Sequence, residues 1–498
     1  MIFERASGIL LHPTCLPGPY GIGDIGPEAY HWVDFLTQAG CNLWQILPLG
    51  PTGYGDSPYQ CFSAFAGNPY LINPDLLLTD GLLHPNDLAD RPNFNNGSVE
   101  YGMVIPWKLN LLNQAFRLFQ DSSSPTLKTE FEAFKFTENS WLDDYALFMA
   151  IKESHGGAPW PTWKPALRQH QPQALRKLRQ VYDEAIQRQI FRQFIFWRQW
   201  NSLHDYANKK GIKIIGDIPI FVAHDSAEVW AKSELFYMDK EGNPTVVAGV
   251  PPDYFSSTGQ LWGNPLYHWD IHAKTTYAWW LERIRSMLKM VDIIRLDHFR
   301  GFDAYWEVPA GDTTAVNGRW VPGPGSDFFE AIQKTLGSLP IIAEDLGIIT
   351  PSVNKLREQF DLPGMKVLVF AFNSGPTNPY LPHNYELRCV AYTGTHDNDT
   401  TRGWYEQTGE DERKFTNRYL NIDGRDISWD LLRAAWSSVA VFAIAPLQDI
   451  LGLGNDARMN YPSSLGNNWK WRLTPNTLTN DLISRLAEIN YLYRRTRI

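Results

Sequence analysis

The sequence predicts an α/β protein whose catalytic unit is a (β/α)8 TIM barrel. Helical segments alternate with short apolar runs rich in Ile and Val, a rhythm typical of parallel strands joined by crossover helices. Three of these runs end on a carboxylate: 293–299 (IIRLDHF), 341–347 (IIAEDLG) and 390–400 (VAYTGTHDNDT). Polar groups at the ends of several different strands favour a barrel over an open, doubly wound sheet.

The first helix–strand pairs are marked by their start and stop signals. A helix begins at Pro27 and ends before Gly40, and the apolar run 42–49 follows it as a strand. The next helix covers 187–210, where large apolar residues recur at helical spacing, and the strand 213–222 comes directly after it. Both strands are long enough and apolar enough to be buried on two faces.

The pattern then repeats toward the first two carboxylates. A helix over 277–290 leads into the strand at 291–299. Asp327 and Glu330 have the spacing of a capping box, so we expect a helix that starts there and runs to Gly337. The apolar run that follows this helix ends on the second carboxylate.

A further pair separates the second carboxylate from the third. Thr350 precedes Pro351, an N-cap followed by proline at the first helical position, and the strand 365–372 comes after that helix. The strand lies between Glu344 and Asp397, which are 53 residues apart. A barrel spends about 31 residues on each unit, so this interval fits two units.

The chain has 498 residues, whereas a barrel of this kind needs about 250, so insertions must hold the excess. The stretch of about 75–185 mixes helical pieces with turn-rich linkers such as 121–125 and lacks the strand rhythm. We predict that it is a largely helical inserted subdomain. A second insertion, the aromatic loop 245–270, is expected over the active site. Residues 1–498 then form a single catalytic barrel unit.

Composition limits the expected cellular location and the classes of binding partner. The net charge of −9 argues against binding to nucleic acid or to anionic membranes. No window approaches 18 uninterrupted apolar residues, and the first residues lack the pattern of a signal peptide. The cysteines form no CxxC pair, which suggests reduced thiols and a cytoplasmic location; they are Cys15, Cys41, Cys61 and Cys389.

The carboxylates at the strand ends have the chemistry of glycosidic bond cleavage, which needs one ionised and one protonated carboxyl group. Asp297 is the better nucleophile, because Arg295 lies two residues earlier on the same strand face and favours its ionised form. Glu344 follows three apolar residues, so desolvation suits it to be the acid. Asp397, beside His396, could bind sugar hydroxyls and favour an oxocarbenium-like transition state.

Each of these residues also has a simpler interpretation. A single carboxylate at a strand end more often caps the next helix or pairs with a basic residue. The cluster at 396–399 (His-Asp-Asn-Asp) also resembles a site for a hard metal ion. The many aromatic residues are consistent with core packing or with exposed platforms for sugar rings.

Eight longer blocks carry more information than these patterns. They are RASGILLHPTCLPGPYGIGDIG (5–26), GYGDSPYQCFSAFAGNPYLI (53–72), GDIPIFVAHDSAEVW (216–230), GVPPDYFSSTGQLWGNPLYHW (249–269), RLDHFRGF (295–302), AEDLG (343–347), GTHDNDT (394–400) and ARMNYPSSLGNNWKWR (457–472). Taken in order, they resemble the 4-α-glucanotransferases called amylomaltase or disproportionating enzyme, of glycoside hydrolase family 77. The resemblance extends from near the N-terminus to near the C-terminus.

The resemblance implies a barrel with inserted, largely helical subdomains and no C-terminal β-sandwich. It also implies a retaining, two-step transfer of α-1,4-glucan segments to the 4-hydroxyl of another glucan or of glucose, without a metal or an organic cofactor. In this family's motifs Asp297 is the nucleophile, Glu344 the acid/base and Asp397 the transition-state stabiliser. The implied partners are maltooligosaccharides, amylose or glycogen-derived glucans as donors and glucose as an acceptor.

The same motifs imply a set of substrate-binding residues. These are Tyr54, Ser57, Tyr59, Asp217, Asp253, Tyr254, Phe255, Trp262, Arg295, His298, His396 and Asn467. An α-glucan hydrolase with the same three carboxylates is the alternative activity. A glucan-binding protein without catalysis is a third possibility, and the intact trio argues against it because binding alone needs no paired carboxylates.

Overall fold

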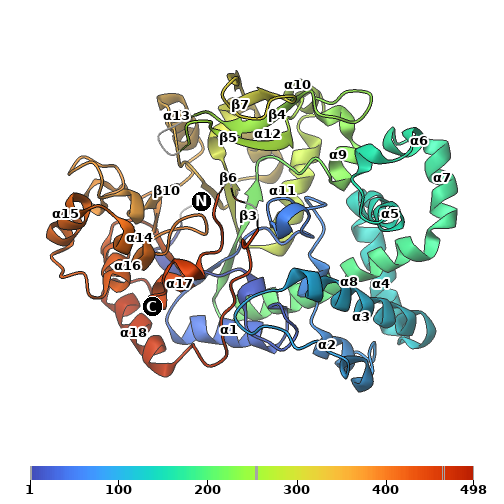
Figure 1. Cartoon of the computed structure of the whole chain (residues 1–498), viewed down its shortest axis with the longest axis horizontal. Helices are drawn as coiled ribbons and strands as arrows, with labels where there is room; N and C mark the ends of the chain where they lie inside the picture. Colours follow the sequence, from blue (N-terminus) through green and yellow to red (C-terminus); the bar gives the residue numbers. More distant parts are fainter. Residues whose placement is uncertain (1–2, 253–255, 463, 465, 497–498) are drawn as a thin grey trace.

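A closed barrel of eight parallel strands forms the centre of the molecule (Figure 1). The computed structural model describes residues 3–252, 256–462, 464 and 466–496. The strand order is β10-β11-β12-β1-β2-β3-β6-β9, and the ring closes where the Ala343 N–H donates to the Pro363 carbonyl (N to O 2.9 Å). The predicted barrel is thus confirmed. The strands are β1 (Ala6–Leu10), β2 (Leu43–Gln45), β3 (Lys213–Pro219), β6 (Ile293–Asp297), β9 (Ile341–Ala343), β10 (Gly364–Val367), β11 (Cys389–Tyr392) and β12 (Phe442–Pro446).

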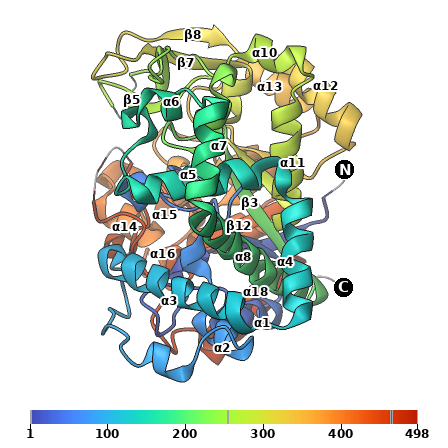
Figure 2. The ribbon, with the colours of Figure 1, turned by 90° about the vertical axis from the view of Figure 1, so that its right-hand side faces the viewer.

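The segment between β2 and β3 is helical over most of its length, as the lack of a strand rhythm predicts. Figure 2 shows several of its helices on the side that faces the viewer. That this segment is a separate subdomain stays a prediction. The helices are α2 (Pro74–Thr79), α3 (Tyr101–Ser122), α4 (Pro125–Thr137), α5 (Asn139–Ser154), α6 (Pro165–Arg168), α7 (Pro172–Val181) and α8 (Asp183–Lys209).

The other helices cover the rest of the barrel, and α14, α15, α16 and α18 lie on the side opposite α5 to α7 (Figure 1). They are α1 (Pro27–Gln38), α9 (Ala227–Ala231), α10 (Trp269–Lys274), α11 (Ala278–Met290), α12 (Gly325–Leu336), α13 (Pro351–Gln359), α14 (Thr401–Gln407), α15 (Glu410–Leu420), α16 (Ile427–Ser437), α17 (Leu447–Ile450) and α18 (Asn480–Leu492). No described helix combines the length and apolar character needed to cross a membrane.

The start of α12 differs from the prediction. The helix begins at Gly325, two residues before Asp327, and no side chain caps its first turn. Gly325 has a φ of +57°, which glycine adopts without strain, and this turn lets the helix start early. Asp327 and Glu330 therefore lie inside the helix instead of forming a capping box.

The aromatic segment 245–270 is more regular than a loop. It contributes β4 (Val246–Val250) and β5 (Gln260–Pro265) to a second, antiparallel sheet of order β5-β4-β7-β8. The partner strands β7 (Ala304–Pro309) and β8 (Arg319–Pro322) follow β6 in the chain. The Pro and Gly residues within the segment hide the period-two pattern from sequence reasoning, and pairing with a distant segment creates the strands.

Most of the tryptophans whose role was open fill the core. Trp44 on β2 lies 6.4 Å from Trp32 on α1 and 6.3 Å from Trp200 on α8, ring centre to ring centre. These contacts join the barrel wall to the helices on both sides of β2. Other tryptophans are also fully buried: Trp160, Trp230, Trp280 and Trp436.

Sequence reasoning did not name β1 and β12, which pair with each other in the barrel. A fully buried arginine near the C-terminus connects β1 to the residues that precede β12. The Arg495 guanidinium donates to the carbonyls of Ala6 (2.9 Å), Trp436 (2.8 Å) and Ala440 (3.2 Å). Burial lowers the pKa of Arg495 to about 9, so it still carries its charge at neutral pH.

We expect Arg495→Met to lower the free energy of unfolding by about 3 kcal/mol, because several buried carbonyls lose a charged donor. Chemical denaturation measures this change. Arg494→Met, at the neighbouring exposed position, is the matched control and should change stability by no more than about 0.5 kcal/mol. Equal unfolding midpoints for the two variants would show that the hydrogen bonds of Arg495 near β1 and β12 do not stabilise the barrel.

Candidate active site

Asp297 and Glu344 occupy matching positions at the carboxyl ends of two neighbouring strands. β6 and β9 pair in parallel with Leu296 opposite Ala343, and each carboxylate is the next residue in its chain segment. The register continues past the strand ends, because the Glu344 N–H donates to the Leu296 carbonyl (2.9 Å). Residues at paired positions of a sheet project to the same face. The two carboxyl groups therefore lie side by side at the barrel mouth.

A buried ion pair supports Asp297 from below. Asp217 on β3 lies opposite Arg295 on β6, and Arg295 Nη1 is 2.7 and 2.8 Å from the two oxygens of Asp217 and 2.8 Å from Asp297 Oδ1. Burial opposes the charge on Arg295, but the carboxylates of Asp217 and Asp297 outweigh it and raise the pKa of Arg295 well above its usual value. The guanidinium stays charged and orients Asp297, as the i, i+2 spacing predicts.

Tyr59 connects this buried pair to the opposite wall. Its hydroxyl donates to Asp217 Oδ2 (2.8 Å), and its ring stacks on His396 with centroids 5.2 Å apart and planes at 14°. Burial, followed by the charge of Asp217, raises the pKa of Tyr59 well above its ordinary value. The phenol thus keeps its proton and acts as a donor.

Glu344 lies in the poorly solvated environment that its apolar flank predicts, with 8% of its surface exposed. Burial and then the charge of Asp297 raise the pKa of Glu344 to about 8. The N–H groups of His298 and Leu346 donate to its two oxygens, each at 2.7 Å, and fix the carboxyl plane. A carboxyl group with this pKa is largely protonated at neutral pH and can give up a proton.

His298 follows Asp297 in a left-handed backbone conformation (φ 50°), a strained geometry for a residue other than glycine. Burial lowers the pKa of His298 to about 4, so the imidazole is neutral at neutral pH. Its ring meets the Trp262 ring edge-on at 4.8 Å. The turn therefore places a neutral side chain between the nucleophile candidate and an aromatic wall.

Asp397 reaches the site from the loop that follows β11. The Asn460 side-chain N–H donates to Asp397 Oδ1 (2.7 Å), and His396 Nε2 lies 3.4 Å from the same oxygen. Asp297, His396 and Asp397 all line one cleft at the barrel mouth. Asp297 and Asp397 thus meet in one cleft, and Glu344 follows the strand next to that of Asp297.

The cleft has a volume of about 520 Å³ and is suited to an extended ligand with both polar and apolar surfaces. Five of the predicted substrate-binding residues line it together with Asp297 and Asp397. These are Tyr54, Ser57, Tyr59, Trp262 and His396. Trp262 lines it from β5, and Tyr54 stands at the rim with 71% of its surface exposed.

The other predicted binding residues have different positions. Asp217 and Arg295 are buried beneath the cleft and act on Tyr59 and Asp297. Asn467 is exposed and accepts a hydrogen bond from Lys470 (3.3 Å), while its chain neighbours line the cleft. A substrate contact of Asn467 stays a prediction. The predicted residues Asp253, Tyr254 and Phe255 lie outside the described residues.

Several cleft residues from two segments of the chain were not predicted. They are Gln260, Asn264, Asn460, Tyr461 and Trp469. Asn460 and Tyr461 belong to the motif block 457–472, which could have pointed to them. The contact between Asn460 and Asp397 had no local signal, because 63 residues separate the two in the chain.

The side chains at 396–399 do not converge as metal ligands would. Asp397 accepts from Asn460, Asn398 accepts from the Thr395 hydroxyl (2.9 Å), and Asp399 pairs with Arg458. Within the described part of the chain, no three His, Cys, Asp or Glu side chains are grouped to hold a metal ion. The loop geometry therefore favours the carboxylate interpretation of Asp397.

The chain is similar to known proteins over nearly its whole length. The profile of the glycoside hydrolase 77 family, described as 4-alpha-glucanotransferase, matches residues 11–479. The 4-alpha-glucanotransferase of Thermus thermophilus is 52% identical over 98% of each chain, and that of Synechocystis is 50% identical over 99% of each. The structure of amylomaltase from Streptococcus agalactiae in complex with acarbose is 40% identical, with a TM-score of 0.96, over 99% of this chain and 100% of that one.

Proposed function

The chain belongs to the 4-alpha-glucanotransferase family, and on this premise we propose a two-step, configuration-retaining mechanism in which Asp297 is the nucleophile and Glu344 the acid/base. The enzyme acts on α-1,4-glucans. One observation carries the proposal: Asp297 and Glu344 each follow a residue of the strand pair Leu296–Ala343. Arg295 binds the Asp297 carboxylate, whereas the pKa of the Glu344 carboxyl group is about 8.

In the first step Asp297 attacks the anomeric carbon of a bound glucose residue. Glu344 gives its proton to the glycosidic oxygen, the bond between that oxygen and the anomeric carbon breaks, and the released glucan leaves as an alcohol. A glycosyl ester then joins the remaining segment to Asp297. Retaining enzymes hold their two carboxyl groups about 5–5.5 Å apart. Asp297 and Glu344 follow paired positions of neighbouring strands, whose backbones lie about 4.8 Å apart, so their side chains can reach this separation.

In the second step the 4-hydroxyl of another glucan or of glucose attacks the ester. Glu344 is now ionised and takes the proton of this hydroxyl, and Asp297 is released as a carboxylate. Two inversions at the anomeric carbon restore the α configuration. All proton and electron-pair movements use these two carboxyl groups, so the proposed steps need no cofactor.

Asp397 is proposed to stabilise the positive charge that develops on the sugar ring in both transition states. Its position in the cleft and its hydrogen bond to Asn460 support this role. Tyr59 and His396 would contact the same glucose residue, and Asp217 and Arg295 would hold them and Asp297 in place.

Transfer in preference to hydrolysis requires that water stays away from the ester. We propose that segment 245–270, including Asp253, Tyr254 and Phe255, covers the cleft and binds donor or acceptor glucans. Gln260, Leu261 and Trp262 of this segment line the cleft and support the proposal. Maltooligosaccharides, amylose or glycogen-derived glucans are the proposed donors. Hydrolysis with the same carboxylates is the competing outcome.

Maltotriose distinguishes the two outcomes. We expect wild-type enzyme to convert it into glucose and a ladder of longer oligosaccharides, with reducing ends nearly constant because each transfer makes as many links as it breaks. Chromatography of the products and a reducing-end assay measure both quantities. A rise in reducing ends that matches the bonds cleaved, without longer products, would instead assign the protein as a hydrolase.

We further infer a cytoplasmic location from the state of the cysteines. Cys15, Cys41, Cys61 and Cys389 are all free thiols, and thiols of this kind persist in a reducing compartment. Alkylation of the unfolded protein isolated under non-reducing conditions should modify all four.

A further inference from the structure

Asp397 lies on a loop, so its position depends on what holds the loop. The loop runs from Thr393 after β11 to Thr401 at the start of α14. Asp449 of α17 fixes both ends, because its carboxylate accepts from the Thr393 hydroxyl (2.6 Å) and from the Thr401 N–H (2.7 Å). Asp397 lies in the middle, four residues from either end, and needs a separate anchor.

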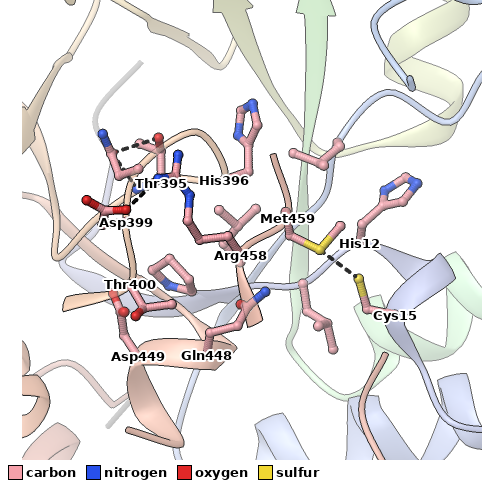
Figure 3. A pocket seen from close by; sticks show the side chains of 15 residues that line it. His12, Cys15, Thr395, His396, Asp399, Thr400, Gln448, Asp449, Arg458 and Met459 are labelled. Carbon is pink, nitrogen blue, oxygen red and sulfur yellow. Dashed lines mark hydrogen bonds and ion pairs between the residues drawn. The ribbon is translucent and has the colours of Figure 1, made fainter. Parts of the chain in front are cut away.

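Arg458 provides contacts to this middle section. Figure 3 shows its guanidinium beside Asp399, with which it forms an ion pair. Nη2 of Arg458 donates to the main-chain carbonyl of Asp397 itself (2.9 Å). One guanidinium thus holds the backbone of Asp397 and the side chain two residues further on. Only 11% of the Arg458 side chain is exposed, so water screens these bonds weakly.

The same guanidinium also holds the residue that binds the Asp397 carboxylate. Nε and Nη2 of Arg458 donate to the Asn460 carbonyl (3.2 and 3.0 Å), and the Asn460 side chain donates to Asp397 Oδ1 (2.7 Å). The Tyr461 ring lies under the guanidinium at 4.1 Å and limits its movement further. The Arg458 guanidinium therefore holds both the main chain of Asp397 and Asn460, the residue that donates to the Asp397 carboxylate.

We propose that Arg458 is a positioning residue that sets the location and orientation of Asp397 in the cleft. The inference rests on the proposed role of Asp397 as transition-state stabiliser. Arg458 does not line the cleft, so it acts through Asp397 and not by contact with the glucan. A planar fork of donors is required, because lysine can neutralise Asp399 but cannot reach two carbonyls and a carboxylate in fixed directions.

The test compares Arg458→Gln and Arg458→Lys with wild type in maltotriose disproportionation. We expect Arg458→Gln to lower kcat about 100-fold, because a shift of about 1 Å in a catalytic group has an effect of this size. KM should change less than about threefold, since ground-state contacts remain. Arg458→Lys should recover part of the kcat loss. Thermal unfolding of each variant shows what fraction is folded at the assay temperature.

Arg485→Gln is the matched control. Arg485 pairs with Asp426 and lies 3.8 Å over the Trp429 ring. It thus shares the ion pair and the ring contact of Arg458 and lies outside the cleft. We expect wild-type kcat and KM from this variant. The control shows whether loss of an arginine with an ion pair and a ring contact is enough to slow the enzyme.

Asp397→Asn separates the failure of this inference from the failure of the proposed function. A strong loss in Asp397→Asn with wild-type kcat in Arg458→Gln would overturn the positioning role alone. A raised KM with unchanged kcat in Arg458→Gln, or a loss that only follows the unfolded fraction, would overturn it as well. Full activity in Asp397→Asn would overturn the proposed role of Asp397 and the inference together.

Discussion

Replacing Asp297 by Asn or Ala is expected to lower kcat for glucan transfer by about 10⁴-fold or more, the size of effect seen when a catalytic nucleophile is removed. Neither variant can form the glycosyl ester, although the cleft and its other contacts remain. Asn keeps the size of the side chain and a hydrogen-bond acceptor for Arg295, which lies 2.8 Å from Asp297 Oδ1. Circular dichroism should therefore show a wild-type fold.

Asp303→Asn is the control for this experiment. Asp303 follows Asp297 by six residues, and its carboxylate accepts from the Ser352 hydroxyl (2.9 Å) outside the cleft. The same chemical change there should leave transfer within about twofold of wild type, because no step of the reaction uses this group. Near-normal transfer in both Asp297 variants would contradict the nucleophile assignment.

Replacing Glu344 by Gln is expected to abolish transfer from maltotriose but to leave the first step with a maltosyl fluoride donor, measured as fluoride release. Fluoride leaves without a proton, so formation of the ester on Asp297 needs little help from an acid. The second step still needs a base, and Gln cannot accept the proton of a sugar hydroxyl. The glycosyl-enzyme should therefore accumulate, and intact-protein mass spectrometry should detect one added maltosyl group.

Peptide mapping of this trapped protein tests both assignments at once. The maltosyl group should be found on the peptide that contains Asp297, and the double variant Asp297→Asn, Glu344→Gln should not be labelled. Equal loss of ester formation with maltotriose and with maltosyl fluoride in Glu344→Gln would contradict the acid role.

The pH dependence should report the same group. Burial raises the pKa of Glu344 to about 8, and the first step needs this carboxyl protonated, so kcat/KM for maltotriose should fall as the pH rises through about 8. With maltosyl fluoride this decline should be weaker, because the proton is not needed. If fluoride release by Glu344→Gln fell over the same pH range as in wild type, a group other than Glu344 would cause the fall.

The fold could be predicted wherever a strand is apolar and bounded by clear stop signals. Six of the barrel strands have such boundaries, for example β3, which follows a helix that ends before Gly211. β12 was missed because its apolar residues continue into α17 without a Gly or a charged residue between them. β1 was missed because it begins at Ala6, without the preceding helix that marks most of the predicted strands.

The three carboxylates could be found because they follow strands whose ends share one edge of the barrel. The contact of Arg295 with Asp297 could also be predicted, since both lie on one strand at a spacing of two. Asn460 and Arg458 could not be found in this way. They reach Asp397 from a separate loop, and neither their spacing nor their residue type indicates that contact.

The order of residues in this chain determined the barrel class, the residue types at the strand ends and the one-strand contact of Arg295 with Asp297. Those features depend on local periodicity and on neighbours a few positions away. Only the tertiary structure decided three other features. They are the raised pKa of Glu344, the ion pair of Arg295 with Asp217 and the hydrogen bond of Arg458 to the Asp397 carbonyl. Burial and contacts between distant segments depend on closure of the barrel, which brings together side chains that no local pattern relates.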